Sequence, residues 1–130
     1  MECPDCDAEA LPFPVPADLR AAVPGEEPGA AICTRCLALH PVADPPADPP
    51  DFQRVSQAMP RDPDAGLPLA LGLGLLRNLA LHRAEIADLF DKVERAGSDP
   101  LLVLDRLAAD GEIDTDLDLE GRRRQLEQLL

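Results

Sequence analysis

Two pairs of cysteines constrain this chain more than any other feature of its 130 residues. Each pair has the spacing C-x2-C, and 26 residues separate the pairs; the four residues are Cys3, Cys6, Cys33 and Cys36. Two residues between cysteines let both sulfurs of a tight turn point at one ion, and Zn²⁺ takes four such ligands as a tetrahedron. The pattern predicts one structural zinc ion, because four thiolates leave no position open for a catalytic water.

Other uses of these cysteines compete with zinc. Iron in a rubredoxin-like site has the same ligands, but the chain has only three aromatic residues, and this shortage favours zinc. Disulfides are disfavoured because the chain opens on the metal motif with no secretory signal. Redox chemistry of C-x-x-C expects a βαβ pattern, which is not evident. His40 could replace a thiolate, but four thiolates complete the shell, so we expect it to be a loop or packing residue.

Acidic residues outnumber basic ones about two to one. The chain has 25 acidic residues, 16 of them Asp, against 11 Arg and one Lys, and its formal net charge is −13. Such repulsion is unfavourable at low ionic strength, whereas at molar salt the Debye length falls to about 3 Å. We therefore expect a cytoplasmic protein of an extreme halophile. The alternative is an ordinary acidic or disordered protein, and an apolar content of 45% argues against disorder.

Composition divides the chain into three regions. Residues 1–43 hold all four cysteines, and residues 44–66 hold six prolines and five aspartates. The second region is predicted to be a semi-extended linker in which Phe52 and Val55 can dock on a neighbour. Residues 67–130 have only two prolines and apolar residues at helical spacing. The prediction is a small α+β protein, with an N-terminal zinc ribbon joined to an all-α module of three to four short helices.

Within the first region, an extended Leu11–Val15 and a return strand Ala30–Ile32 flank a short helical candidate at Ala17–Val23. The two C-x2-C turns are the zinc knuckles of the predicted ribbon. No apolar run approaches the roughly 20 residues that a membrane helix needs. We expect no membrane association.

The helical region has sequence signals for helix N-termini, for apolar helix faces and for helix C-termini. The first helix is expected over Leu67–Leu81, although Gly72 and Gly74 each cost about 1 kcal/mol against Ala. The second has an apolar stripe and ends before Gly97; the stripe is Ile86, Leu89, Phe90 and Val93. Asp99-Pro100 begins the third helix, and Asp118 caps the last, in which four leucines point inward: Leu119, Leu126, Leu129 and Leu130. Such short helices form a marginal core, so we expect them to dock on the zinc module or to self-associate.

The inventory for catalysis is poor. The chain has two histidines, His40 and His82, and two serines, and it has neither a P-loop nor G-x-S-x-G. An EF-hand loop that began at Asp114 would need Gly at its sixth position and Glu at its twelfth, where the chain has Leu119 and Gln125. The acidic run from Asp110 to Glu120 is therefore expected to be a solvated loop with a helix cap. His82 is expected to be a cap or surface residue. We expect a non-enzymatic protein with no catalytic or cofactor-binding residues apart from the metal ligands; an enzyme would need a deep pocket with a histidine and paired carboxylates.

Two kinds of partner remain. The preferred one is an unknown protein, or a second copy of the chain, bound through the helical region. The alternative is a nucleic-acid-associated factor of transcription or translation. The chain's only basic cluster is Arg122-Arg123-Arg124, and it has no Trp or Tyr on which bases could stack, so this alternative is less favoured. These arginines are expected to pair at i, i+4 with acids, as Glu120–Arg124 and Arg123–Glu127.

A resemblance supports these expectations. CPDC at the start, AICTRCLALHPV, the Pro/Asp segment and NLALHRAEIADLFDKVERAGSDPLLVLDRLAAD ending in RRRQLEQLL together resemble a family of small, uncharacterised haloarchaeal zinc-ribbon proteins. The resemblance covers nearly the whole chain and implies zinc, a cytoplasmic halophile and no defined reaction. Zinc knuckles commonly have Gly after the second cysteine, where this chain has Asp7 and Leu37. Asp tolerates the left-handed conformation that such a position requires.

The two-part architecture predicts that loss of the metal would affect the two parts differently. Because the first 43 residues have little apolar core of their own, the metal is expected to hold them folded. Cys33→Ser is then expected to unfold residues 1–43 while the helical region keeps its helical signal.

Overall fold

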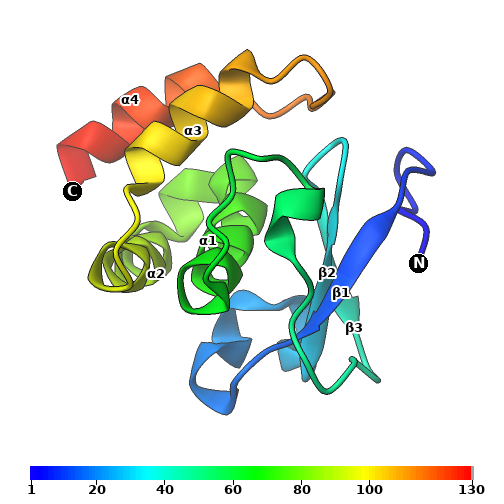
Figure 1. The fold of residues 1–130 in the computed structure, drawn as a ribbon. Coiled ribbons are helices and arrows are strands. Elements are labelled where there is room, and N and C mark those ends of the chain that lie inside the picture. The colour runs from blue at the N-terminus through cyan, green and yellow to red at the C-terminus, as the bar shows by residue number, and fades with distance from the viewer. Residues whose placement is uncertain (130) are drawn as a thin grey trace.

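Three short strands form an antiparallel sheet in the computed structural model, which describes residues 1–129 (Figure 1). The strands lie in the order β1-β2-β3; their bounds are β1 (Ala10–Pro14), β2 (Gly29–Cys33) and β3 (Leu39–Val42). Two 3-10 segments, η1 (Ala17–Ala22) and η2 (Pro24–Glu26), fill the excursion between β1 and β2. Helices pack against the sheet, so the predicted α+β class is confirmed.

The register of the sheet separates two buried faces. Leu11 lies opposite Ile32, and both side chains belong to the main core that the sheet shares with the helices. Ala10 lies opposite Cys33, and both belong to a smaller buried cluster around the cysteines. This division follows from the period of two along a strand. The sequence did not predict β3, a four-residue edge strand that contains Pro41, a residue tolerated at a sheet edge.

Within residues 1–129, four α-helices follow the sheet, in agreement with the predicted three to four. Their bounds are α1 (Pro63–Leu75), α2 (Arg83–Arg95), α3 (Pro100–Ala109) and α4 (Leu119–Leu129), and the 3-10 segment η4 (Leu76–Leu81) continues α1. The predicted helix ends are largely confirmed. Gly97 follows α2 with a φ of 98°, and the side chain of Asp99 accepts the first N–H groups of α3. Asp118 accepts the N–H of Gly121 at 3.0 Å. Leu119 and Leu126 of α4 are buried as predicted, but the inward position predicted for Leu129 is wrong, because this last residue of α4 is 37% exposed at the rim of a surface pocket. The prediction for Leu130 lies outside the described residues.

The prediction of one helix over Leu67–Leu81 is wrong at both ends. α1 begins at Pro63 because the side chain of Asp62 accepts the N–H of Asp64 and Pro63 suits the first helical position. The α-helix ends at Leu75, and Asn78 in η4 has a non-helical backbone (φ −122°, ψ 50°).

Helix α1 is buried on all sides over Ala65–Leu73, as expected of a helix that is apolar all round. Its glycines let three neighbours approach closely. A Cβ added at Gly66 would meet the ring of Phe52, one at Gly72 would meet the ring of Phe90, and one at Gly74 would meet Leu39. The helix therefore packs between the segment before it, α2 and β3, and the expected docking of the helices on the N-terminal region is present.

Replacing Gly72 with alanine is expected to destabilise the protein by about 1–2 kcal/mol. Alanine gains about 1 kcal/mol in helix propensity, but its Cβ would overlap the fully buried Phe90 ring, and overpacking this severe costs about 2–3 kcal/mol. Urea denaturation measures the change. Gly111→Ala is the control, because no atom lies within 4 Å of the added Cβ. A Gly72→Ala variant as stable as the wild type would contradict the close packing.

The proline-rich segment also contributes to the core. Phe52, in the 3-10 segment η3 (Phe52–Arg54), is fully buried, and its ring packs edge-on against Phe13 of β1 at a centroid distance of 5.3 Å. Val55 is buried too, so the predicted docking of these two side chains is confirmed. The division at residues 43 and 66 stays a prediction from composition; one cluster of buried side chains includes residues from all three regions.

Candidate metal centre

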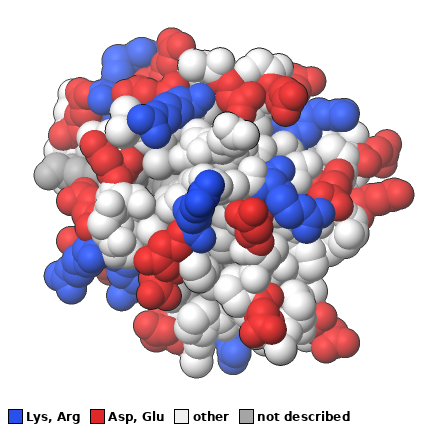
Figure 2. All heavy atoms as spheres, viewed as in Figure 1, with Lys and Arg blue, Asp and Glu red and all other residues white. Residues whose placement is uncertain are grey.

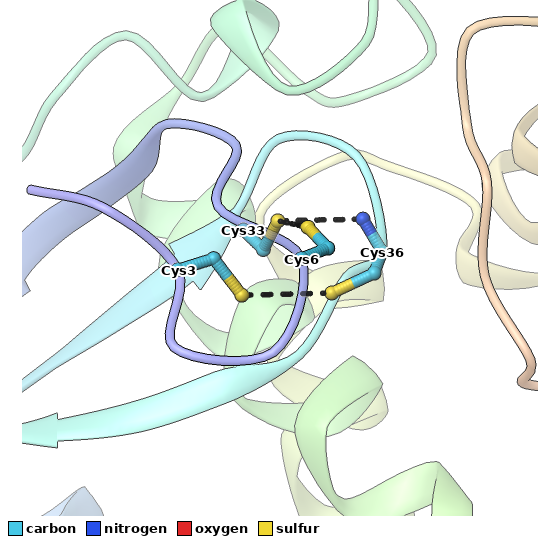
Figure 3. Close-up of side chains that lie close together, drawn as sticks. All are labelled: Cys3, Cys6, Cys33 and Cys36. Atoms are coloured by element: carbon cyan, nitrogen blue, oxygen red, sulfur yellow. Dashed lines mark hydrogen bonds between the residues drawn. The ribbon is translucent and has the colours of Figure 1, made fainter.

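The four cysteines come together from two turns at the same end of the sheet (Figure 3). The first pair lies in the turn before β1, where the N–H of Cys3 donates to the carbonyl of Ala8 at 2.7 Å. The second pair lies between β2 and β3, where the N–H of Cys33 donates to the carbonyl of Ala38 at 2.9 Å. In both turns the first cysteine therefore bonds to the residue five positions later. The pairing of β1 with β2 then brings the two turns together.

The sulfur–sulfur distances fit one metal ion. The Sγ atoms of Cys3 and Cys36 lie 3.7 Å apart, and those of Cys6 and Cys33 lie 3.3 Å apart. All four lie within 4.8 Å of one another. A tetrahedron with metal–sulfur bonds of about 2.3 Å has edges of about 3.8 Å, whereas a disulfide bond measures about 2.05 Å. The cysteines are free thiols in the structure, and their geometry is compatible with a shared metal ion.

Backbone N–H groups surround the sulfurs in the same way in both turns. The N–H groups of Arg35 and Cys36 each lie 3.4 Å from the Sγ of Cys33. The N–H groups of Asp5 and Cys6 stand in the same positions relative to Cys3. Such donors favour the thiolate form that a metal ligand requires.

Burial and these donors shift the thiol pKa values in opposite directions. Burial acts to raise the pKa of Cys3, but hydrogen bonds from the N–H groups of Asp5 and Cys6, together with those to the His40 and Cys33 side chains, leave that pKa below its ordinary value. The N–H of Ala8 lowers the pKa of Cys6. Burial raises the pKa of both Cys33 and Cys36. The second pair therefore keeps its protons unless a cation compensates, and metal binding would release them.

The residue after the second cysteine of each pair is left-handed. Asp7 has a φ of 65° and Leu37 a φ of 64°. A left-handed conformation strains any residue with a Cβ, which explains why glycine is common at such positions. Asp7 is exposed, whereas the Leu37 side chain is fully buried in the main core. Burial of Leu37 offsets its backbone strain, so only position 7 gains from glycine.

Asp7→Gly is expected to stabilise the protein by about 0.5–1 kcal/mol, because glycine adopts a positive φ without a steric penalty. Chemical denaturation of the metal-loaded protein measures the gain. Asp48→Gly removes the same charge from an exposed position without a positive φ, and it should leave stability unchanged or lower it. Equal effects of the two variants would show that charge, and not backbone conformation, governs position 7.

His40, which was predicted to be a loop or packing residue, lies in a strand and packs beside the candidate metal site. It is in β3, and its Nε2 lies 3.6 Å from the Sγ of Cys3 and 3.6 Å from the Asp5 carboxylate. The pairing of β3 with β2 sets His40 opposite Ala31, which belongs to the cluster around the cysteines. The alternation of Ala38, His40 and Val42 was the signal for this face. His82 precedes α2 without a side-chain cap bond, and its Nδ1 lies 3.5 Å from Glu85.

The second cysteine turn is tied to the loop between α3 and α4. The guanidinium of Arg77 donates to the carbonyl of Cys36 at 3.1 Å and pairs with Asp116. The N–H of Asp114 donates to the carbonyl of Arg35 at 2.8 Å. Arg77 holds the pKa of the Asp116 carboxyl below its ordinary value. The acidic run, which was predicted to be a solvated loop, therefore contacts the second cysteine turn. The sequence analysis did not predict this interaction.

A small α+β fold with four cysteine sulfurs gathered at one end of its sheet defines a protein with a candidate metal site. The chain belongs to a family of unknown function, DUF6276, whose model matches residues 2–130. Comparison of the chain with curated proteins and with solved structures gives no match. The family match extends over the same length as the resemblance found in the sequence. It supports the expectation of a family without an assigned reaction.

Proposed function

We propose that this chain is a non-enzymatic protein in which one zinc ion stabilises an N-terminal zinc ribbon. The observation that carries the proposal is the cage of four sulfurs, all within 4.8 Å of one another and supplied by Cys3, Cys6, Cys33 and Cys36. Zinc suits four thiolates in a tetrahedron because it has no geometric preference of its own. The two similar turns next to short antiparallel strands are the arrangement expected of a ribbon.

A structural role is favoured over catalysis by the expected shell of the metal and by the contacts of two side chains that could do chemistry, Ser56 and His40. Four thiolates would complete the shell of a bound zinc ion and leave no site for water. Ser56 is buried, and its hydroxyl donates to Asp110 at 2.7 Å. His40 faces Cys3.

We propose that the protein acts through contacts with another protein or with a second copy of itself. Leu81 is 78% exposed and Leu102 is 43% exposed, and both belong to the helical part of the chain. Nucleic-acid binding is the alternative, but the cluster Arg122–Arg124 gives it little support because Arg123 is already paired with acidic side chains. Arg123 lies 2.7 Å from Asp105 and also pairs with Glu127, as predicted, whereas the predicted Glu120–Arg124 pair is not among the ion pairs of residues 1–129. Figure 2 shows basic side chains interspersed with acidic ones on the face in view.

Metal analysis tests the central claim. Protein purified in molar KCl should contain one zinc per chain and no iron, and cobalt substitution should give the absorption of a tetrahedral thiolate site. Mass spectrometry under non-reducing conditions should show four free thiols after metal removal. Stoichiometric iron, or a mass lower by four hydrogens, would overturn the zinc assignment.

Solution mass and nucleic-acid binding test the proposed partners. Light scattering at low and molar KCl, with and without cross-linking, measures self-association. Retention on immobilised RNA and DNA at several salt concentrations measures the alternative. Salt-dependent retention that is lost when Arg122, Arg123 and Arg124 are changed to Ala would favour the nucleic-acid factor.

We further propose that the protein is adapted to a salt-rich cytoplasm. Its net charge of −13 is expected to make the thermal midpoint rise between 0.1 M and 2 M KCl, because the salt screens repulsion among carboxylates. Thermal unfolding followed by circular dichroism measures this shift, and an uncharged osmolyte at equal osmolality is the control. A midpoint that does not rise with KCl would contradict salt adaptation. None of the helices in residues 1–129 is long and apolar enough to cross a membrane.

A further inference from the structure

We propose that a pocket between η4 and α4 binds the phosphate group of a small molecule. The pocket has a volume of about 300 Å³. Its polar lining is formed by Arg83, Arg122, Gln125 and Gln128, over apolar side chains that include Leu79 and Leu129. No carboxylate of residues 1–129 lines it, although the chain has 25 acidic residues. A cavity of this size suits a small ligand and not a macromolecule.

The guanidinium of Arg122 is held in place at this pocket. Its Nη1 donates to Oε1 of Gln125 at 2.9 Å, and its Nη2 donates to the carbonyl of Arg77 at 3.2 Å. The side chain is half-buried, and its Nε is buried without a hydrogen-bond partner. A guanidinium fixed by neutral acceptors is pre-organised and still carries its full charge.

Arg122 has no acidic counter-ion among the described residues. Arg77 and Arg123, its neighbours in the fold and in the sequence, both have one. Withdrawing a cation from water is unfavourable unless an anion compensates it. The Asp118 carboxylate lines an adjoining pocket with Arg122 but forms no ion pair with it. In a chain with twice as many acids as bases, a half-buried arginine without an ion pair favours an anion supplied from solution.

Arg83 adds a second positive charge to the lining of the pocket. It is exposed, it has no ion pair within residues 1–129, and it is the first residue of α2. A cation at a helix N-terminus is disfavoured by the helix dipole, so helix stability does not explain its position. Two guanidinium groups match the charge of about −1.5 to −2 on a phosphate monoester better than the single charge of a carboxylate. The amides of Gln125 and Gln128 can donate to the remaining oxygens.

Binding of inorganic phosphate and of pyrophosphate tests this proposal, measured by calorimetry or NMR titration of the metal-loaded full chain. The buffer should contain at least 0.2 M KCl, because the protein's net negative charge repels anions at low ionic strength. Saturable binding is expected, with the largest NMR shifts at Arg83, Arg122 and Gln125. Arg122→Gln and Arg83→Gln should each weaken binding about tenfold or more, since each removes a charge-assisted hydrogen bond.

The control variants distinguish specific phosphate binding at this pocket from nonspecific attraction of anions to positive charge. Arg95→Gln removes the same charge from the other end of α2, where Arg95 pairs with Asp91 at 2.9 Å, and it should leave phosphate binding unchanged. Arg83→Gln changes an exposed side chain, so the proposal stays testable if Arg122→Gln fails to fold. Acetate is expected to bind more weakly than phosphate. The absence of saturable phosphate binding, an equal loss in Arg95→Gln, or tighter binding of acetate would each overturn the proposal. Zinc content, measured in the same samples, is expected to stay constant.

Discussion

Replacing Cys33 with serine is expected to unfold the described fold as a whole. Composition predicts loss of the first 43 residues alone, but the buried side chains of β1 and β2 belong to the same cluster as those of α1 and α2. A structural zinc ion contributes about 10–16 kcal/mol of apparent binding free energy. The total stability of a small domain is about 5–15 kcal/mol. If the proposed zinc ion is bound, the free energy lost with it would exceed the stability that the shared core supplies.

The contacts of the second cysteine turn give the same expectation. Arg77 bonds to the carbonyl of Cys36, and Asp114 bonds to that of Arg35, so displacement of this turn removes hydrogen bonds from η4 and from the loop before α4. Sheet and helices should then lose their structure together. Helical circular dichroism, limited proteolysis and metal content, measured on one sample in molar KCl, report the result.

Ala31→Ser is the matched control for this variant. Ala31 is fully buried in the cluster around the cysteines, so the change introduces a buried hydroxyl without removing a ligand. It should cost about 1–3 kcal/mol and keep the metal. A Cys33→Ser protein that retains its helical signal and protease resistance beyond residue 66 would show instead that the helices fold independently, as composition predicts. One that retains a full equivalent of zinc would contradict the assignment of Cys33 as a ligand.

The sequence predicts the local features of this fold well because each depends on neighbouring residues. The spacing within each cysteine pair brings two sulfurs together in one turn, and the caps at Asp99 and Asp118 act within three residues of the helix start. The stripe of α2 is buried as its period predicts. The left-handed conformation expected for Asp7 also depends only on the turn that contains it.

Long-range contacts were not predictable from these patterns. The weak strand β3 has only four residues, and its pairing with β2 is what brings His40 to Cys3. The bond from Arg77 to Cys36 joins residues 41 positions apart and has no local signature. The glycines of α1 count against a helix by propensity, yet they permit the close approach of Phe52 and Phe90. In each case tertiary packing outweighs the local preference.

Phe52→Ala is expected to destabilise the protein by about 3–5 kcal/mol, although Phe52 lies in a segment that composition predicts to be a linker. The ring is fully buried, packs against Phe13 at 5.3 Å and contacts Gly66 of α1. Truncation leaves a cavity in the main core and removes an aromatic pair. Because Gly66 leaves space shaped for this ring, little relaxation is available to fill the cavity.

Urea denaturation of the zinc-loaded protein, followed by circular dichroism and by zinc release to a chelator dye, measures this effect. Both signals should shift to lower urea together, since the Phe52 ring touches the sheet that carries the cysteines and the helix at the centre of the fold. Phe52→Leu keeps most of the apolar volume and should cost about 1–1.5 kcal/mol, and Asp48→Ala, exposed in the same segment, should change stability by about 0.5 kcal/mol or less. If Phe52→Ala changed the free energy of unfolding no more than Asp48→Ala does, the segment would contribute no stability to the fold, as expected of a linker. A shift in only one signal would mean that Phe52 stabilises one side of the core and does not join the two.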